Sequence, residues 1–231
     1  MCGIMINGST GGIKVYFNSV NLFGNYTRST ATITAGFFAY SNASDLDIRN
    51  NIFANSMINT GSTDAKAYAI YSSAPSSSFT KLDYNDYYVS GVQGVLGYFN
   101  TADQTSLASL RAATGKDVHS INVDPLFISN NDLHTNNIDL FGVGTPITGI
   151  TTDIDGNPRH ATPSIGADEV ELLPVNLKLL SIDNNIHGCE YSGNTPVSFT
   201  VINLGTDPVT SFDATYILDG QTPITQTFTT N

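Results

Sequence analysis

The first ninety residues carry a pattern of apolar and polar positions that recurs at a fixed spacing. Three stretches read apolar-x-x-Asn-x-apolar, at residues 15–20, 48–53 and 82–87. Their asparagines, Asn18, Asn51 and Asn85, lie 33 and 34 residues apart. Self-similarity with a period of about 20–50 residues is typical of a solenoid, in which each repeat stacks on the next.

A second apolar element shares this period. Residues 3–6 match residues 36–39, which lie 33 positions further on, and residues 67–70 follow after another 31. The apolar residues alternate or form short runs between Gly, Asn and Ser, and they show no helical period. The pattern therefore favours a β-solenoid over a helical repeat, with about three coils over residues 1–91.

The recurring asparagines are predicted to have a structural role. An Asn tolerates a left-handed backbone bend, and its side-chain amide can bond to an Asn stacked above it. We therefore expect Asn18, Asn51 and Asn85 to form a polar corner between parallel strands.

The pattern changes after residue 91. Leu107, Leu110 and Ala113 fall on one helical face, with Thr105 or Ser106 as the N-cap and a glycine at position 115. Residues 92–171 are interpreted as a short helical insertion followed by the segment that closes the solenoid, and residues 172–176 as a linker. Alternating apolar residues then predict a partial β-sandwich over residues 177–231. Because residues 3–6 already belong to a coil, we expect the natural protein to continue upstream, and the sandwich to continue beyond residue 231.

Several motifs together resemble a known family. They are "IKVYFNSV", "DIRNNIF", "LDYNDYYVSG", "DPLF", "DLH", "TDIDGNPR" and "IGADE". They are similar to the right-handed parallel β-helix repeat proteins secreted by Bacteroidetes-type bacteria, over about residues 1–171. Residues 137–144, "NIDLFGVG", depart from the family pattern. The last segment resembles the immunoglobulin-like, adhesion-type modules that follow such helices. The resemblance implies an exported, modular cell-surface protein, with a signal peptide on the upstream sequence.

Charge and composition narrow the possible partners. The 231 residues carry a formal charge of −11, which argues against binding to nucleic acid or to anionic membranes. No apolar run approaches the about 20 residues of a membrane span, so membrane insertion is not expected. Cys2 and Cys189 are too few and too distant for a disulfide framework and are predicted to be unpaired. We expect no cofactor and no oligomer.

A catalytic site is the alternative to a structural role, because parallel β-helices include polysaccharide lyases and hydrolases. Such enzymes need carboxylates, or carboxylates with a basic side chain, on neighbouring coils. The repeat places Asp83 beside Arg49, and Asp86 beside Ile52, so no acidic column forms. No catalytic residue is assigned, and enzymatic activity remains an open alternative that would require active coils upstream.

The aromatic residues offer a binding surface. Tyr84, Tyr87 and Tyr88, with Tyr71, Phe79 and Tyr98 nearby, are candidates for a platform that binds a polysaccharide or a cell-surface glycan. Aromatic faces stack on the apolar faces of sugar rings. The alternative is that these rings pack in the core and at its rim, where the helical insertion docks.

The motif "TTDIDGNPR" contains the candidate metal ligands Asp153 and Asp155. Their spacing resembles the start of a calcium loop, but the positions that an EF-hand fills with Gly and Glu hold Pro and Ser. The alternative is a tight turn, with Arg159 paired to Asp153 or Asp168. A second histidine does not lie at ligand spacing from His134, so the sequence does not support zinc.

The sequence thus predicts an all-β chain with a right-handed parallel β-helix, one short helical insertion and a truncated β-sandwich. The expected function is a non-catalytic structural or adhesive module of an extracellular or cell-surface protein. The alternative is polysaccharide binding or cleavage.

Overall fold

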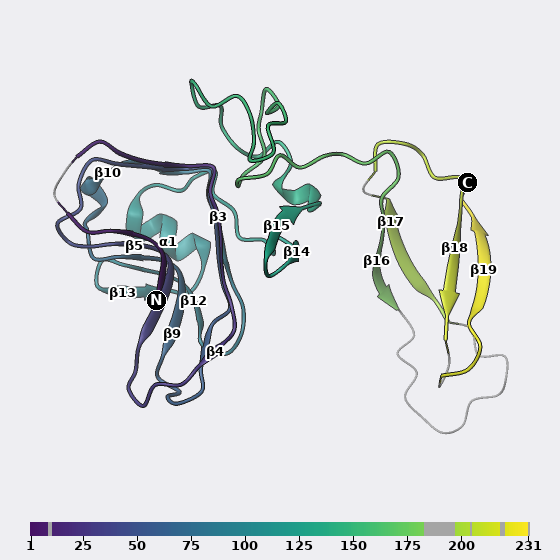
Figure 1. Cartoon of the computed structure of the whole chain (residues 1–231), viewed down its shortest axis with the longest axis horizontal. Coiled ribbons are helices and arrows are strands. Elements are labelled where there is room, and N and C mark those ends of the chain that lie inside the picture. The colour runs from purple at the N-terminus through teal and green to yellow at the C-terminus, as the bar shows by residue number, and fades with distance from the viewer. Residues whose placement is uncertain (9–10, 183–196, 204, 218–219, 231) are drawn as a thin grey trace. The chain divides into compact units, whose positions relative to one another are not determined.

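The computed structural model describes residues 1–8, 11–182, 197–203, 205–217 and 220–230. The chain divides into two compact units, Met1–Val170 and Glu171–Asn231, next to the predicted linker. Each unit is described by itself. The prediction of an all-β chain is confirmed, since a single α-helix accompanies the strands of the described residues (Figure 1).

The N-terminal unit holds fifteen strands and three helices among its described residues. They are β1 (Cys2–Ile6), β2 (Ile13–Tyr16), β3 (Ser19–Leu22), β4 (Asn25–Tyr26), β5 (Ile33–Ala39), β6 (Leu46–Arg49), β7 (Ile52–Asn55), β8 (Ile58–Asn59), β9 (Lys66–Ser72), the 3-10 helix η1 (Ser76–Ser78), β10 (Phe79–Asp83), β11 (Asp86–Val89), β12 (Gly94–Phe99), β13 (Ala102–Gln104), α1 (Leu107–Thr114), β14 (Phe127–Ser129), β15 (Asp132–Thr135) and the 3-10 helix η2 (Ile138–Leu140).

The first twelve strands pair in parallel across the repeats. One sheet has the order β1-β5-β9-β12, extended by the antiparallel β13, and two others have the orders β2-β6-β10 and β3-β7-β11. Strands β4 and β8 also pair in parallel. Ile4 lies opposite Phe37, and Phe37 opposite Ile70, so the spacing of 33 residues in the sequence is the spacing between paired strands.

One predicted alignment is wrong by two residues. The sequence pattern matched residues 36–39 with residues 67–70, but the strands pair with Phe37 opposite Ile70. A shift of two residues leaves the same side chains on the same face of a strand. The apolar pattern alone therefore does not distinguish the two registers.

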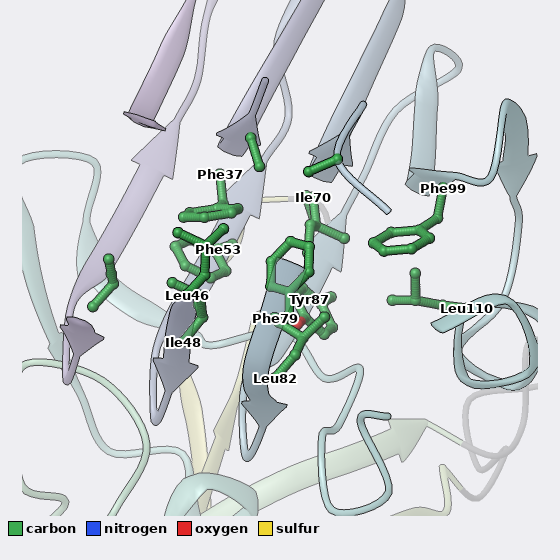
Figure 2. Packing of buried hydrophobic residues seen from close by; sticks show 14 of the residues in the cluster. Phe37, Leu46, Ile48, Phe53, Ile70, Phe79, Leu82, Tyr87, Phe99 and Leu110 are labelled. Carbon is green, nitrogen blue, oxygen red and sulfur yellow. The ribbon is translucent and has the colours of Figure 1, made fainter. Parts of the chain in front are cut away.

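The core lies between the three parallel sheets. Phe37, Phe53, Phe79, Tyr87 and Phe99 are almost completely buried there, and Figure 2 shows the rings from successive repeats side by side. The centroids of the Phe53 and Tyr87 rings are 6.1 Å apart, and those of Phe79 and Phe99 are 5.8 Å apart. The rings thus continue from one repeat to the next.

Helix α1 closes this core at the level of β12. Leu110 is fully buried next to Phe99, and Leu107 and Ala113 pack against the same cluster, as their predicted shared face requires (Figure 2). Of the two possible N-caps, Ser106 is the one used, because its side chain accepts a hydrogen bond from the Ser109 amide. Gly115 ends the helix in the left-handed conformation at φ 65°.

The three asparagines stack as a ladder at the corner between the second and third sheets. Asn18 Nδ2 donates to Asn51 Oδ1 at 2.9 Å, and Asn51 Nδ2 donates to Asn85 Oδ1 at 2.9 Å. The backbone amides of Asn18 and Asn51 donate to the same two oxygens. At the end of the ladder, the Asn85 amide donates to Ser120 Oγ at 3.0 Å, so a serine replaces the next asparagine.

The left-handed bend falls one residue earlier than expected. Phe17, Asn50 and Tyr84, each directly before a ladder asparagine, have φ values of 52°, 60° and 56°. A left-handed conformation costs a non-glycine residue about 1 kcal/mol or more. The ladder asparagines do not adopt the bend themselves. Their side chains instead bond the backbone around it, since Asn18 Nδ2 donates to the carbonyl of Tyr16.

Residues 137–170, called the cover segment below, lie over the outer face of the β3-β7-β11 sheet. Ile52 and Phe53 are adjacent on β7, yet Phe53 belongs to the central core while Ile52 packs with Leu140 and Ile165 of the cover segment. Side chains of neighbouring strand residues point to opposite faces of a sheet. The cover segment therefore buries the face that points away from the core.

A buried ion pair holds the cover segment together. Arg159 Nη1 lies 3.0 Å from Glu169 Oε2, and both side chains are at most 5% exposed. The prediction that Arg159 pairs with Asp153 or Asp168 is therefore wrong. The guanidinium also lies 3.9 Å from the centroid of the Phe17 ring, so it connects the cover segment to the first repeat.

The C-terminal unit contains two antiparallel pairs of strands in its described residues. They are β16 (Leu177–Ile182) with β17 (Phe199–Asn203), and β18 (Ser211–Tyr216) with β19 (Ile224–Thr229). Phe199, Phe212 and Phe228 pack against one another with ring centroids 5.1–6.5 Å apart. The predicted β-sandwich stays a prediction.

Of the two cysteines, Cys189 lies outside the described residues. Cys2 is a free thiol at the edge of a small cluster in the N-terminal unit.

A search of the described residues finds no helix with the length and apolarity needed to cross a membrane.

The ladder generates a first prediction. Replacing the fully buried Asn51 by alanine removes the acceptor of the Asn18 amide and the donor to the carbonyls of Val15 and Arg49. Each buried polar group left without a partner costs about 1–3 kcal/mol. We expect the free energy of unfolding, followed by tyrosine fluorescence in urea, to fall by about 3 kcal/mol or more.

The control for this prediction is Asn42→Ala, at an exposed turn position. Its effect is expected to stay within about 0.5 kcal/mol. Equal effects of the two substitutions on the free energy of unfolding would contradict a stabilising role of the ladder.

Candidate functional site

An open groove of about 530 Å³ lies on the outer face of the β3-β7-β11 sheet. Asn21, Ala54 and Tyr88 are paired neighbours on the three strands and belong to its lining. The segment 124–130 supplies most of the other lining residues. The complete lining is Asn21, Ala54, Asn55, Ser56, Tyr88, Ser90, Asp124, Pro125, Leu126, Phe127, Ser129 and Asn130.

Hydrogen bonds fix the position of the groove's aromatic residue. The Tyr88 hydroxyl donates to Asp124 Oδ2 at 2.8 Å, and the other carboxylate oxygen accepts from the Leu126 amide at 2.9 Å. Burial, together with this bond, raises the pKa of Tyr88 above its usual value, so the hydroxyl stays protonated. Leu126 adopts φ 49° and remains 46% exposed beside Tyr88. The groove thus combines the rings of Tyr88 and Phe127 with hydroxyls, amides and a carboxylate.

The three tyrosines singled out in the sequence do not form one platform. Tyr88 lines the groove, whereas Tyr87 is fully buried and donates its hydroxyl to Asp117 at 2.9 Å. Tyr84 lies at the left-handed corner, and its ring stacks on His119 at 4.5 Å. Tyr87 and Tyr88 are neighbours on β11 and point to opposite faces, and Tyr84 lies before this strand, so the three tyrosines do not share one surface.

The other aromatic candidates also separate. Tyr71 and Tyr98 stack with Phe38 on the outer face of the first sheet, with centroids 4.7 Å and 4.4 Å apart. Because these rings cover each other's faces, little aromatic face is left for a sugar ring. Phe79 belongs to the central core. Of the six aromatic candidates, Tyr88 is therefore the one that lines the groove.

Two carboxyl groups are buried near the end of the repeats. Asp86 Oδ1 accepts a hydrogen bond from the Val123 amide at 3.0 Å, and its Oδ2 has no partner among the described residues. Asp117 Oδ1 accepts from Tyr87 and Ser120, and its Oδ2 also has none. Burial raises the pKa of Asp86 to about 8 and that of Asp117 to about 7. Neither residue lines the groove.

The two candidate metal ligands have different surroundings. Asp153 is largely buried, and its two oxygens accept hydrogen bonds from the backbone amides of Asp155, Asn157 and Glu169. This is the tight turn that the sequence offered as the alternative to a calcium loop. Asp155 is half exposed, and its Oδ2 lies 2.6 Å from His134 Nε2. The sequence pattern did not predict that His134 and the buried Asp168 lie close to Asp155.

His134 is held by two carboxylates. Its Nδ1 lies 2.5 Å from Asp132 Oδ1, and its Nε2 faces Asp155. The bond to Asp132, followed by the bond to Asp155, raises the pKa of His134 to about 9. One signal in the sequence was the concentration of acidic residues in "NDLHT", "TDIDG" and "GADE". Their convergence depends on the path of the cover segment, which has no repeat.

The columns considered for a catalytic site occur as expected. Tyr16, Arg49 and Asp83 are paired neighbours on one sheet, and Ser19, Ile52 and Asp86 on the next. These two columns hold one carboxylate each. Asp47, two residues before Arg49 on the same strand, pairs with Arg49 at 2.6 Å and accepts a hydrogen bond from the Tyr16 hydroxyl, so the charge of Arg49 is balanced by a neighbouring carboxylate.

Comparison with known proteins finds no matching family model, no similar curated protein and no similar solved structure.

The buried carboxyl groups predict a dependence of stability on pH. Because burial raises the pKa of Asp86 and Asp117 above 3.8, the folded state binds protons that the unfolded state has lost between about pH 4 and pH 8. Their contribution is complete below pH 4 and is lost as the pH rises through 7–8. We expect the free energy of unfolding, measured with urea, to fall by more than about 1 kcal/mol from pH 5 to pH 8.

The substitution Asp86→Asn removes one of these titrating groups and should flatten that decline. The matched control is Asp64→Asn, at an exposed position, which should leave the slope as it is. A stability that is constant or rises between pH 5 and pH 8 in the unmodified protein would contradict the assignment.

Proposed function

We propose that residues 1–170 form a right-handed parallel β-helix that serves as a non-catalytic structural or adhesive module. The observation that carries this proposal is the parallel pairing of strands from successive repeats, with Asn18, Asn51 and Asn85 stacked at one corner. A connection between parallel strands of one sheet is right-handed in about 98% of cases, which supports the proposed hand.

The physical properties of this arrangement suit a rigid spacer. Each repeat contacts its neighbours through backbone hydrogen bonds and stacked core rings, so the stability grows with the number of repeats. Asp47 and Arg49 form an ion pair on the second sheet. Asp47 is therefore not part of a cluster of unpaired carboxylates of the kind that a hydrolase would need. This favours a structural role over catalysis in residues 1–91.

The proposal places this module outside the cell, followed by an immunoglobulin-like β-sandwich in residues 177–231. The motifs shared with secreted β-helix surface proteins support export. The three phenylalanines that pack between the two strand pairs of the C-terminal unit support a sandwich. The proposal requires neither a membrane-spanning segment nor a nucleic-acid partner.

The test is surface labelling. Antibodies raised against the purified chain should label intact, unpermeabilised cells that express the natural protein, and external protease should remove the signal. An antibody against a cytosolic protein is the control for cell integrity. Labelling seen only after permeabilisation would refute export to the surface.

The second candidate function is polysaccharide binding in the groove beside Tyr88. The supporting observation is the lining, which places one oriented aromatic ring among hydroxyls, amides and the Asp124 carboxylate. Ligand sites use a few precisely placed polar groups to orient the ligand. The carboxylate favours a neutral, hydroxyl-rich glycan over an acidic one. Cleavage of such a glycan would require active coils upstream of this chain.

A glycan array and titration of its hits test this candidate. Tyr88→Ala should weaken binding of any neutral glycan by about tenfold, which corresponds to the loss of one aromatic contact. Tyr88→Phe keeps the ring and should retain most of the affinity. Tyr40→Ala changes an exposed tyrosine outside the groove and is the matched control. Absence of signal for every glycan, or equal losses in Tyr88→Ala and Tyr40→Ala, would exclude the groove as a glycan site.

A further inference from the structure

Three side chains that could bind a metal ion converge at the edge of the cover segment. His134 lies on β15, Asp155 in the tight turn that follows Asp153, and Asp168 near the end of the N-terminal unit. One nitrogen or oxygen atom of each lies within 4.8 Å of the corresponding atoms of the other two. They come from three segments that are distant in the sequence, so the fold itself brings them together.

The imidazole is already oriented toward this cluster. Asp132 contacts Nδ1 of His134, which leaves Nε2 directed at Asp155. A carboxylate on the far nitrogen is the arrangement that commonly fixes the ring of a metal-ligating histidine. Asp132 therefore orients the imidazole of His134 so that Nε2 can bind a metal ion.

The two carboxylate ligands are also held in place. Asp168 is 9% exposed, and its Oδ2 accepts a hydrogen bond from the Thr135 amide at 3.1 Å. The Asp155 amide donates to Asp153 Oδ1 at 3.0 Å, so the turn fixes the backbone from which Asp155 projects. Asp153 itself is occupied by backbone amides and is not a ligand.

The charge around the cluster is unbalanced. Asp132, Asp155 and Asp168 surround His134, and Asp153 lies in the same turn as Asp155. The nearest arginine of the cover segment, Arg159, is committed to Glu169 and to backbone carbonyls. A cation in the cluster would balance carboxylates that otherwise have one imidazole between them.

We propose that His134, Asp155 and Asp168 bind a first-row divalent transition-metal ion, of the class of Zn²⁺ or Mn²⁺. An imidazole nitrogen with carboxylate oxygens is a donor set suited to these ions. Calcium takes six to eight oxygen ligands, more than the cluster offers, and magnesium prefers oxygen alone. The sequence lacks a second histidine at ligand spacing, but two carboxylates complete the set. The bound ion joins β15 to the cover segment.

Metal titration of the full chain after removal of metals by chelator tests the proposal. Isothermal titration with Zn²⁺ and with Mn²⁺ should show one ion per chain, and each ion should raise the melting temperature. His134→Gln and Asp155→Asn should each weaken binding at least tenfold. The matched control is His119→Gln, because His119 pairs with a carboxylate as well, that of Asp83 at 2.8 Å, but lies outside the cluster.

Pulsed electron paramagnetic resonance of the Mn²⁺-loaded chain identifies the nitrogen ligand. Its spectrum should show coupling to an imidazole nitrogen that disappears in His134→Gln and persists in His119→Gln. Circular dichroism checks that each variant is folded. The proposal is overturned if neither ion binds, if only Ca²⁺ or Mg²⁺ binds, or if binding is the same in the His134 and Asp155 variants as in the His119 control.

Discussion

The left-handed corner in front of each ladder asparagine is the constraint on which the N-terminal unit depends. Phe17, Asn50 and Tyr84 adopt a conformation that is unfavourable for residues with side chains, and they do so at equivalent places in three repeats. In the first two of these repeats the following asparagine, Asn18 or Asn51, offsets this cost, because its side chain donates to the carbonyl just before the bend and to the asparagine of the next repeat. One corner therefore sets the registers of two sheets at once, because the strands before and after it are displaced by the same 33 or 34 residues.

The same corner residues also contact the later parts of the chain. Phe17 packs under the guanidinium of Arg159, and Tyr84 stacks on His119. The Asn50 side chain exchanges two hydrogen bonds with the backbone of Thr145, at 2.8 and 2.9 Å. A corner that is fixed by the ladder thus presents side chains that later segments bind. Loss of the ladder is expected to loosen the cover segment as well as the sheets.

The repeating features could be predicted from the sequence, and the single ones could not. The hydrogen bonds among Asn18, Asn51 and Asn85 follow from spacing, because equivalent residues of stacked repeats must be neighbours. The side of α1 that packs on the core followed from the helical spacing of Leu107, Leu110 and Ala113. Ser120 takes the next ladder position without being an asparagine, so no pattern marked it. The pairing of Arg159 with Glu169 depends on a non-repeating path, and sequence proximity alone gave the wrong partner.

The distribution of charge explains why the cover segment is the chemically distinctive part of the chain. Residues 124–171, which contain the cover segment and the strands before it, hold eight of the 20 acidic residues but one of the nine basic residues. The carboxylates that this segment buries need hydrogen-bond donors. Backbone amides serve Asp153, and Arg159 with His160 and Ser164 serves Glu169. Asp132 and Asp155 both contact His134, and Asp168, which accepts the Thr135 amide, lies beside them. The negative charge of this segment is therefore least balanced around His134, whose imidazole contacts Asp132 and Asp155, and a bound cation would be most favourable there.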